Sequence, residues 1–298
     1  MYMQRCVPAF LLGIMFLISA SISGQITEEE KPGADFQLFY RAVQPGEVIL
    51  LKSDSSGSVA SAYAVFCGKK YLMDKVEKSS RILGLIGLDL EHKPGTYPLK
   101  VVVRYANGQT ESTSIDVTVH AKQFPEEKLW VEEKFVTPPR EVRERIQWES
   151  ELLRSIYSVS SDSWLGNGSF ILPVEGRASN NFGKRRIFNN KPRSPHSGQD
   201  ISAPGGTPVV ASNAGRVVLA KDLYFSGGTV IIDHGLGVFS YYCHFSQTSV
   251  ERGQWVKRGQ KIGSVGATGR VTGPHLHWSV RAAGSRVDPF SLVFLDLE

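Results

Sequence analysis

Two histidines stand one residue apart near the C-terminal end of the chain. They are His275 and His277, in the stretch "VTGPHLHWSV". If this stretch forms a strand, side chains alternate, so both imidazoles leave one face while Leu276 and Trp278 leave the other. Two imidazoles on one face indicate a metal site, a catalytic site or both. A pair of surface histidines on an edge strand is the alternative.

A second group of candidate ligands lies upstream. "SPHSGQDISAPGGTP" places His196 four residues before Asp200, and "YYCHFS" adds His244. Two imidazoles and one carboxylate fill three positions of a tetrahedral zinc ion and leave the fourth for water, which is typical of a catalytic zinc site. The prolines and glycines around His196 and Asp200 predict a loop and a strand. The fold must then bring this pair to the strand of His277.

These motifs together resemble the lysostaphin-type (LytM-like) zinc metallopeptidases. The resemblance rests on H-x-x-x-D followed by "ISAPGGTPV", then Y-x-H, then G-x-x-x-G ahead of "GPHLHW", and it covers about residues 170 to 292. It implies one zinc ion per chain and two catalytic histidines. The implied zinc ligands are His196, Asp200 and His277, and the implied catalytic residues are His244 and His275.

The chemistry of such a site suits hydrolysis of an amide bond. Zinc lowers the pKa of a bound water toward about 7 and polarises a peptide carbonyl. A neutral imidazole can take the proton of that water, and another can stabilise the oxyanion or protonate the leaving amine. His275 shares the strand face of a ligand and is suited to one of these roles. The sequence leaves open whether His244 or His275 is the base.

Residues for the wall of a substrate groove are also predicted. Tyr242 is expected to share a strand face with His244 and to help hold substrate, while the cysteine between them points away. Arg185 lies in "SNNFGKRR", which resembles the segment that opens the family's domain, and is predicted to line the groove. A solvated face is the alternative for Arg185 and Arg186. His234, at the end of a strand before a turn, is predicted to be structural.

The N-terminus predicts a secretory signal peptide over residues 1–24. Arg5 precedes an apolar run from about residue 7 to residue 22, and the chain turns acidic at 28–30. This is the order of a signal peptide. An uncleaved membrane anchor is the alternative, but the run is slightly shorter than the about 20 apolar residues of a comfortable span. We therefore expect no stable membrane insertion after cleavage.

The rest of the chain predicts a mainly β fold in two domains. Residues 25–122 carry short alternating runs separated by turn signals such as Asn107-Gly108, which favours an immunoglobulin-like β-sandwich. Residues 123–168 predict a linker with one amphipathic helix. Residues 169–298 predict the metallopeptidase domain, an antiparallel β domain of the barrel-sandwich (duplicated hybrid motif) type. The apolar face of the helix consists of Val142, Ile146, Leu153 and Ile156.

The composition indicates the general class of protein. The chain has 298 residues, 41% of them apolar and 21% charged, with a formal net charge of +5, which is typical of a globular protein. Nothing in it resembles a nucleic-acid module. The resemblance implies an exported, monomeric zinc endopeptidase that cuts peptide cross-links of bacterial peptidoglycan, in a periplasm or outside the cell. The alternative is a non-catalytic wall-binding regulator of another hydrolase, a class that typically lacks zinc ligands.

Overall fold

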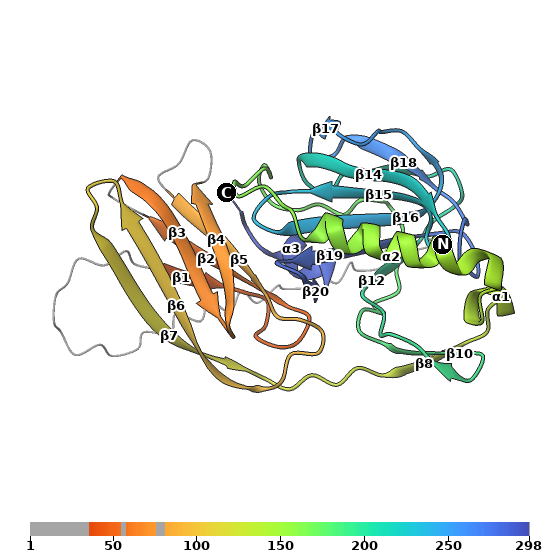
Figure 1. The fold of residues 1–298 in the computed structure, drawn as a ribbon, viewed down its shortest axis with the longest axis horizontal. Coiled ribbons are helices and arrows are strands. Elements are labelled where there is room, and N and C mark those ends of the chain that lie inside the picture. The colour runs from red at the N-terminus through yellow and green to blue at the C-terminus, as the bar shows by residue number, and fades with distance from the viewer. Residues whose placement is uncertain (1–35, 55–57, 76–80, 298) are drawn as a thin grey trace, which may run out of the picture. The chain divides into compact units, whose positions relative to one another are not determined.

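Strands dominate the described part of the chain, as Figure 1 shows, which confirms the mainly β prediction. The computed structural model describes residues 36–54, 58–75 and 81–297, so the predicted signal peptide over 1–24 lies outside the described residues. These residues fall within one unit, Gly33–Glu298. Within this part of the chain, no helix combines the length and the apolar character that a membrane span requires.

The first seven strands form one antiparallel sheet in the order β1-β2-β5-β4-β3-β6-β7. The turn at Asn107-Gly108 joins β6 to β7, with Gly108 at a φ of 88°, as predicted for a hairpin. β5 pairs with both β2 and β4, so the strands follow one continuous path, whereas an immunoglobulin-like fold divides its strands between two sheets. The bounds are β1 Phe36–Phe39, β2 Val48–Asp54, β3 Val59–Phe66, β4 Lys69–Lys75, β5 Arg81–Gly87, β6 Gly95–Tyr105 and β7 Thr110–Val119.

A ten-stranded sheet carries the histidine motifs. Its main path is β17-β14-β15-β16-β19-β12-β9, with β18 joining β13 to β16 and β20 pairing with β19. A short helix, α3 (Pro289–Phe294), follows it. The bounds are β9 Arg177–Ala178, β12 Gly198–Ser202, β13 Pro208–Val210, β14 Gly215–Leu223, β15 Gly227–Asp233, β16 Val238–Thr248, β17 Trp255–Val256, β18 Lys261–Val265, β19 His275–Ala282 and β20 Ser285–Val287.

The predicted linker contains more structure than its amphipathic helix. β8 (Glu126–Leu129) pairs in parallel with β10 (Arg185–Phe188), which also pairs with β11 (Lys191–Pro192). A short helix, α1 (Glu133–Val136), follows β8. The strand was not predicted because "EEKL" has no alternating apolar pattern and pairs only with residues about 60 positions later. The part of the chain before the metallopeptidase motifs therefore contributes a strand beside them.

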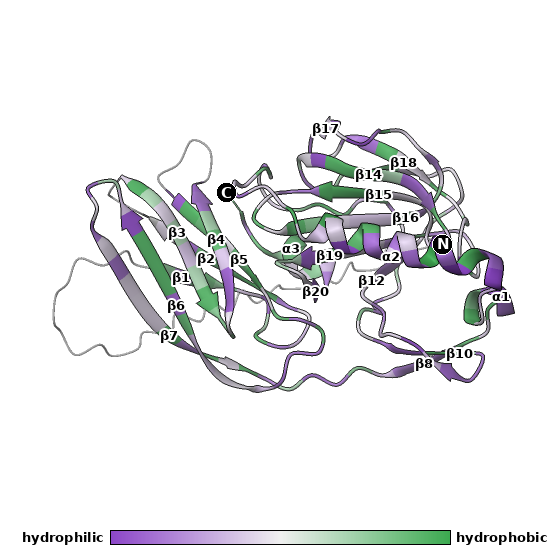
Figure 2. Cartoon of the chain, in the orientation of Figure 1, coloured by the Kyte–Doolittle hydropathy of each residue, from purple (hydrophilic) through white to green (hydrophobic). Residues whose placement is uncertain are grey.

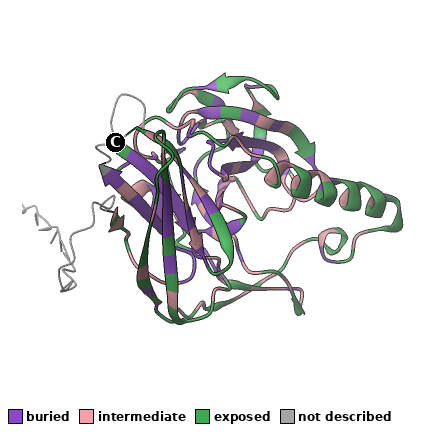
Figure 3. Ribbon diagram, turned by 60° about the vertical axis from the view of Figure 1, so that its left-hand side comes forward, coloured by how far each residue is buried: buried purple, intermediate pink, exposed green. Residues whose placement is uncertain are grey.

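The amphipathic helix forms, although Val142 of the predicted apolar face lies in the turn before it. A single 3₁₀ turn, η1 (Arg140–Val142), leads into α2 (Arg143–Tyr157). Figure 2 shows polar and apolar positions alternating along α2, and in Figure 3 its outer side is exposed. Its apolar side chains pack against a buried cluster on β14, β15 and β16, made by Leu219, Leu223, Ile231 and Phe239.

A buried carboxylate attaches α2 to the loop after β14. Glu149 is 5% exposed, and its two oxygens accept the backbone N–H of Tyr224 at 3.1 and 2.9 Å. Arg145, one turn earlier, donates to Glu149 at 2.7 Å. A buried charge of this kind is tolerated when it is paired and hydrogen-bonded. The contact fixes the helix to the segment that leads toward His244.

Replacing Glu149 with alanine is expected to lower the free energy of unfolding by about 2 to 3 kcal/mol, because a buried N–H loses a charged acceptor. Urea unfolding of the full chain measures this. The exposed Glu151, which contacts Gln147 on the same helix, is the matched control, and Glu151→Ala should change stability by less than about 0.5 kcal/mol. Equal effects of the two substitutions would show that Glu149 does not anchor the helix.

Candidate metal centre

Strand register brings together two of the predicted ligands from distant parts of the sequence. β12 and β19 pair antiparallel with Asp200 directly opposite His277. Along β19 burial alternates as the sequence predicts, with His275 and His277 half-buried and Leu276 and Trp278 fully buried. Both histidines therefore leave the face on which Asp200 also lies.

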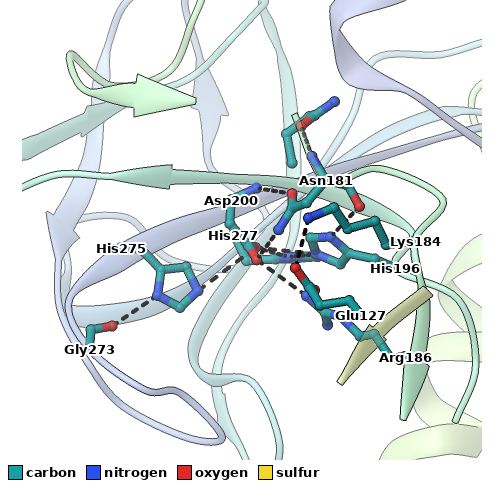
Figure 4. Close-up of polar contacts among 10 residues, drawn as sticks. Glu127, Asn181, Lys184, Arg186, His196, Asp200, Gly273, His275 and His277 are labelled. Atoms are coloured by element: carbon teal, nitrogen blue, oxygen red, sulfur yellow. Dashed lines mark hydrogen bonds and ion pairs between the residues drawn. The ribbon is translucent and has the colours of Figure 1, made fainter. Parts of the chain in front are cut away.

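The third predicted ligand, His196, lies in the loop before β12 and is almost fully buried. Its Nε2 is 2.8 Å from Nδ1 of His277 and 3.2 Å from Oδ1 of Asp200. Nδ1 of His277 is 2.8 Å from the same carboxylate oxygen. Figure 4 shows the three side chains pointing at one another. Ligand atoms around a tetrahedral zinc ion lie about 3.3 Å apart, so these three donors fit a single metal ion.

Neighbouring groups orient His196 and Asp200, as is typical of metal ligands. Nδ1 of His196 lies 3.1 Å from the backbone oxygen of Asn181, which leaves Nε2 as the lone-pair donor. The side chain of Asn181 donates to Oδ2 of Asp200 at 2.8 Å, and Arg186 donates to the same oxygen at 3.2 Å. Oδ1 of Asp200 is therefore the oxygen that faces the two histidines (Figure 4).

The charge states of the cluster suit a cation. Burial alone raises the pKa of Asp200, but the adjacent His196 and His277 outweigh it and hold the pKa well below its usual range. Burial lowers the pKa of His277 to about 4, against the opposing effect of Asp200. At neutral pH the cluster thus presents a carboxylate and a neutral imidazole, the protonation states in which these groups bind metals.

Two more histidines border the cluster. Nδ1 of His275 is 2.9 Å from the backbone oxygen of Gly273, and Nδ1 of His244 is 2.8 Å from that of Thr268. In the neutral tautomer in which each carbonyl accepts the Nδ1–H, Nε2 is the nitrogen that carries the lone pair. The two ring centroids are 4.9 Å apart, and that of His244 is 6.2 Å from that of His277. Burial lowers the pKa of His244 to about 3, with His277 and His275 adding to the effect.

The prediction that Tyr242 shares the groove with His244 is wrong. Tyr242 is fully buried, and its hydroxyl lies 2.9 Å from the backbone nitrogen of Ser212, away from the histidines. His244 has a φ of 68°, and the pairing of β15 with β16 shifts register at this point. This bulge breaks the alternation of side chains. His244 therefore shares the groove with Tyr241 and Cys243, which line it instead.

A groove of about 840 Å³ contains the five predicted metal-binding and catalytic residues. Arg185, predicted for its wall, is exposed and outside it, whereas its neighbour Arg186 lines it. Strand alternation on β10 separates the two. Sequence reasoning also missed Asn181 and Arg270; the only signal for Asn181 was the family-like segment around it. The groove is further lined by Leu129, Leu153, Tyr157, Phe188, Arg193, Phe225 and Arg281.

Two chain segments, 225–227 and 268–270, pack closely against each other next to His244. The backbone N–H of His244 donates to Ser226 at 2.9 Å, and that of Arg270 donates to Phe225 at 2.8 Å. Between these contacts Gly227 (φ 61°) and Gly269 (φ 76°) pass so close that a Cβ on either would collide with the opposite segment. Segments 225–227 and 268–270 thus form one closely packed support.

His234 is structural, as predicted. It is fully buried, with Nδ1 at 2.6 Å from the backbone oxygen of Ala214 and Nε2 at 2.6 Å from the hydroxyl of Ser240. Its ring packs against Phe170 at a centroid distance of 5.0 Å. Burial lowers the pKa of His234 to about 4.

This shift predicts a loss of stability in acid. In the unfolded chain His234 binds a proton below about 6.5, whereas the folded chain holds it neutral down to about 4. Its contribution is therefore complete above pH 6.5 and falls by about 3 kcal/mol as the pH drops toward 4. Urea unfolding with a chelator present should give His234→Gln a weaker pH dependence than the wild type over this range. Parallel curves would contradict the assignment.

Comparison with known proteins agrees with this geometry. Residues 194–289 match Peptidase family M23. The chain is 44% identical over 119 residues to peptidoglycan DD-endopeptidase ShyA of Vibrio cholerae serotype O1, covering 39% of this chain and 28% of that protein. It is 44% identical over 97 residues to DD-carboxypeptidase/endopeptidase Mpg of Neisseria meningitidis serogroup B, covering 33% and 22%. The matched region thus spans about a quarter of these relatives.

A solved structure at 34% identity aligns with most of the chain. It is described as a putative peptidase M23 from Pseudomonas aeruginosa and has a TM-score of 0.64 over 85% of this chain and 96% of that one. The fold matches that of this peptidase, and the His/Asp/His cluster could hold a metal ion. The chain belongs to peptidase family M23.

Proposed function

We propose that this chain is an exported, zinc-dependent endopeptidase that hydrolyses peptide cross-links of bacterial peptidoglycan and acts as a monomer. The observation that carries the proposal is the convergence of His196, Asp200 and His277 beside two histidines whose Nδ1 atoms are held by backbone carbonyls, within one groove. The names of the relatives, peptidoglycan DD-endopeptidase and DD-carboxypeptidase/endopeptidase, supply the substrate class.

Zinc is the metal that this donor set favours. Two imidazole nitrogens and one carboxylate oxygen, with no cysteine among them, leave a fourth position open on a tetrahedral ion. His196 would bind through Nε2, His277 through Nδ1 and Asp200 through Oδ1. When bound, zinc lowers the pKa of water and polarises a peptide carbonyl.

The two flanking histidines would move the protons. Because a backbone carbonyl accepts Nδ1–H in His244 and in His275, each ring offers Nε2 as an acceptor toward the groove. One imidazole would take a proton from the attacking water at Nε2, and the imidazolium so formed would then donate a hydrogen bond to the oxyanion or return that proton to the leaving amine. Either histidine could act as this base, so the identity of the base stays open.

Digestion of purified peptidoglycan tests the proposal. The full chain loaded with zinc should release new peptide carboxyl and amino ends in equal amounts, identified by mass spectrometry. Cleavage confined to the glycan strands would contradict it. A non-catalytic regulator would release no ends and would purify without stoichiometric zinc. The presence of both catalytic candidates and all three candidate ligands disfavours that alternative.

A further inference from the structure

A group of arginines lines the same groove beside the metal centre. Arg186, Arg193 and Arg270 come from β10, from the loop after β11 and from the segment that precedes β19. Arg186 is engaged with Asp200. Among the residues that the structure describes, neither Arg193 nor Arg270 forms an ion pair with a carboxylate.

Arg270 is held in place by aromatic rings. Its guanidinium carbon lies 4.8 Å from the ring centroid of Phe188 and 5.0 Å from that of Phe225. Arginine stacks well on such faces, which fix the plane of the guanidinium and leave its N–H groups at the edge. Nothing in the described chain accepts a hydrogen bond from this guanidinium. Arg193, by contrast, donates to the backbone oxygens of Pro192 and Val136.

The positive charge of Arg270 is poorly compensated. Burial lowers its pKa to about 10, and the neighbouring Arg186 and Arg193 add to the effect. A half-buried, planar and uncompensated guanidinium is suited to bind an anion through two parallel N–H donors, which is the geometry of an arginine–carboxylate pair.

Arg270 is also tied to the catalytic machinery. The segment 268–270 holds Nδ1 of His244 through the backbone oxygen of Thr268, and the N–H of Arg270 donates to Phe225, next to the residue that accepts the N–H of His244. An anion bound by Arg270 would therefore lie in the groove beside the reacting bond.

We propose that Arg270 binds a substrate carboxylate on the carbon that carries the leaving amine. This specificity assignment rests on the proposed function. In a peptide bond between two D-centres, the carbon bearing the amine also bears a carboxyl group. In a cross-link made through the second amine of a diamino acid, the carboxyl group on the carbon that bears this amine is free. In a linear peptide, the same carboxyl group is free when the residue that supplies the amine is the C-terminal one. An internal bond of a peptide bridge has no charge there.

Two matched pairs of substrates test the assignment with the zinc-loaded full chain. One pair is a cross-linked peptidoglycan dimer with this carboxylate free or amidated. The other is a linear peptide ending in D-alanyl-D-alanine, as acid or amide. Wild type should prefer the acid in at least one pair by about 10- to 100-fold in kcat/KM, the usual scale for a charged hydrogen bond. The pair that shows the preference identifies the source of the carboxylate.

Variants assign this preference to one side chain. Arg270→Gln should lower kcat/KM for the acid and leave the amide within about threefold, so the preference disappears. Arg270→Lys keeps the charge but not the planar donors, and should retain part of the preference. Arg281→Gln is the matched control, because Arg281 lines the same groove, stacks on Tyr157 at 4.6 Å and should not affect the ratio of acid to amide. Each variant should keep its zinc.

Three outcomes overturn the assignment. The assignment is wrong if wild type cleaves acid and amide equally, if Arg270→Gln slows cleavage of both to the same degree, or if Arg281→Gln also abolishes the preference. In these cases hydrolysis itself persists and the proposed function stands. If wild type cleaves neither member of either pair nor purified peptidoglycan, the proposed function fails and the assignment of Arg270 fails with it. Should Arg270→Gln not fold, Arg270→Lys decides, since an undiminished preference would contradict a bidentate contact.

Discussion

Zinc and hydrolysis are expected to be lost together when His277 is replaced with alanine. The substitution removes one of three donors that lie 2.8 to 3.2 Å apart and leaves the carboxylate of Asp200 without one of its two imidazole neighbours. Loss of an outer partner of a metal ligand typically costs 10- to 100-fold in affinity, so loss of a ligand should cost more than about 100-fold. Hydrolysis should become undetectable.

Metal content by plasma mass spectrometry, beside hydrolysis of a peptidoglycan suspension, measures both effects in one preparation. Circular dichroism shows whether the variant remains folded. His196→Ala should give the same pattern, because its Nε2 is another of the three donors and lies 2.8 Å from Nδ1 of His277 and 3.2 Å from Oδ1 of Asp200. One zinc ion per chain in folded His277→Ala would contradict the ligand assignment.

His275→Ala and His244→Ala should fail differently. Both should retain about one zinc ion per chain, because neither side chain is among the three converging donors. Hydrolysis should still fall by about two to four orders of magnitude, the usual effect of removing a positioned acid or base. Proton transfer through water can reduce the loss at either position.

The comparison between positions 275 and 277 is internally controlled. The two histidines stand on the same strand, on the same face and with similar exposure. If the two residues were ordinary surface histidines, neither substitution would reduce zinc content or hydrolysis. Near-normal activity in His275→Ala, or loss of its zinc, would refute the role given to its side chain.

The local sequence pattern was sufficient to predict how His275 and His277 are oriented. Strand periodicity correctly put His275 and His277 on one face, because burial of Leu276 and Trp278 fixes the orientation of β19. Periodicity failed on β16, where Tyr242 lies opposite the buried Trp278, while a bulge brings His244 into the groove together with Cys243. Nothing local marks this bulge, because it arises from pairing with β15 and from the carbonyl of Thr268, 24 residues away.

Long-range pairing explains the remaining differences. The pairing of Asp200 with His277 depends on a register across 77 positions, so only the resemblance joined them beforehand. Arg185 and Arg186 cannot be told apart without the direction in which β10 faces. The helix α2 was predicted because its apolar positions follow the helical period, whereas β8 owes its form to β10 rather than to its own residues.

Titration of metal-free protein with zinc shows whether hydrolysis requires one bound metal ion per chain. The full chain is stripped with a chelator, returned to buffer and given increasing zinc, while release of peptide ends from purified peptidoglycan is followed. We expect no hydrolysis without metal, and a linear rise that levels off at one zinc ion per chain. Full hydrolysis by the metal-free chain, or continued absence of hydrolysis once one zinc ion is bound, would contradict the account.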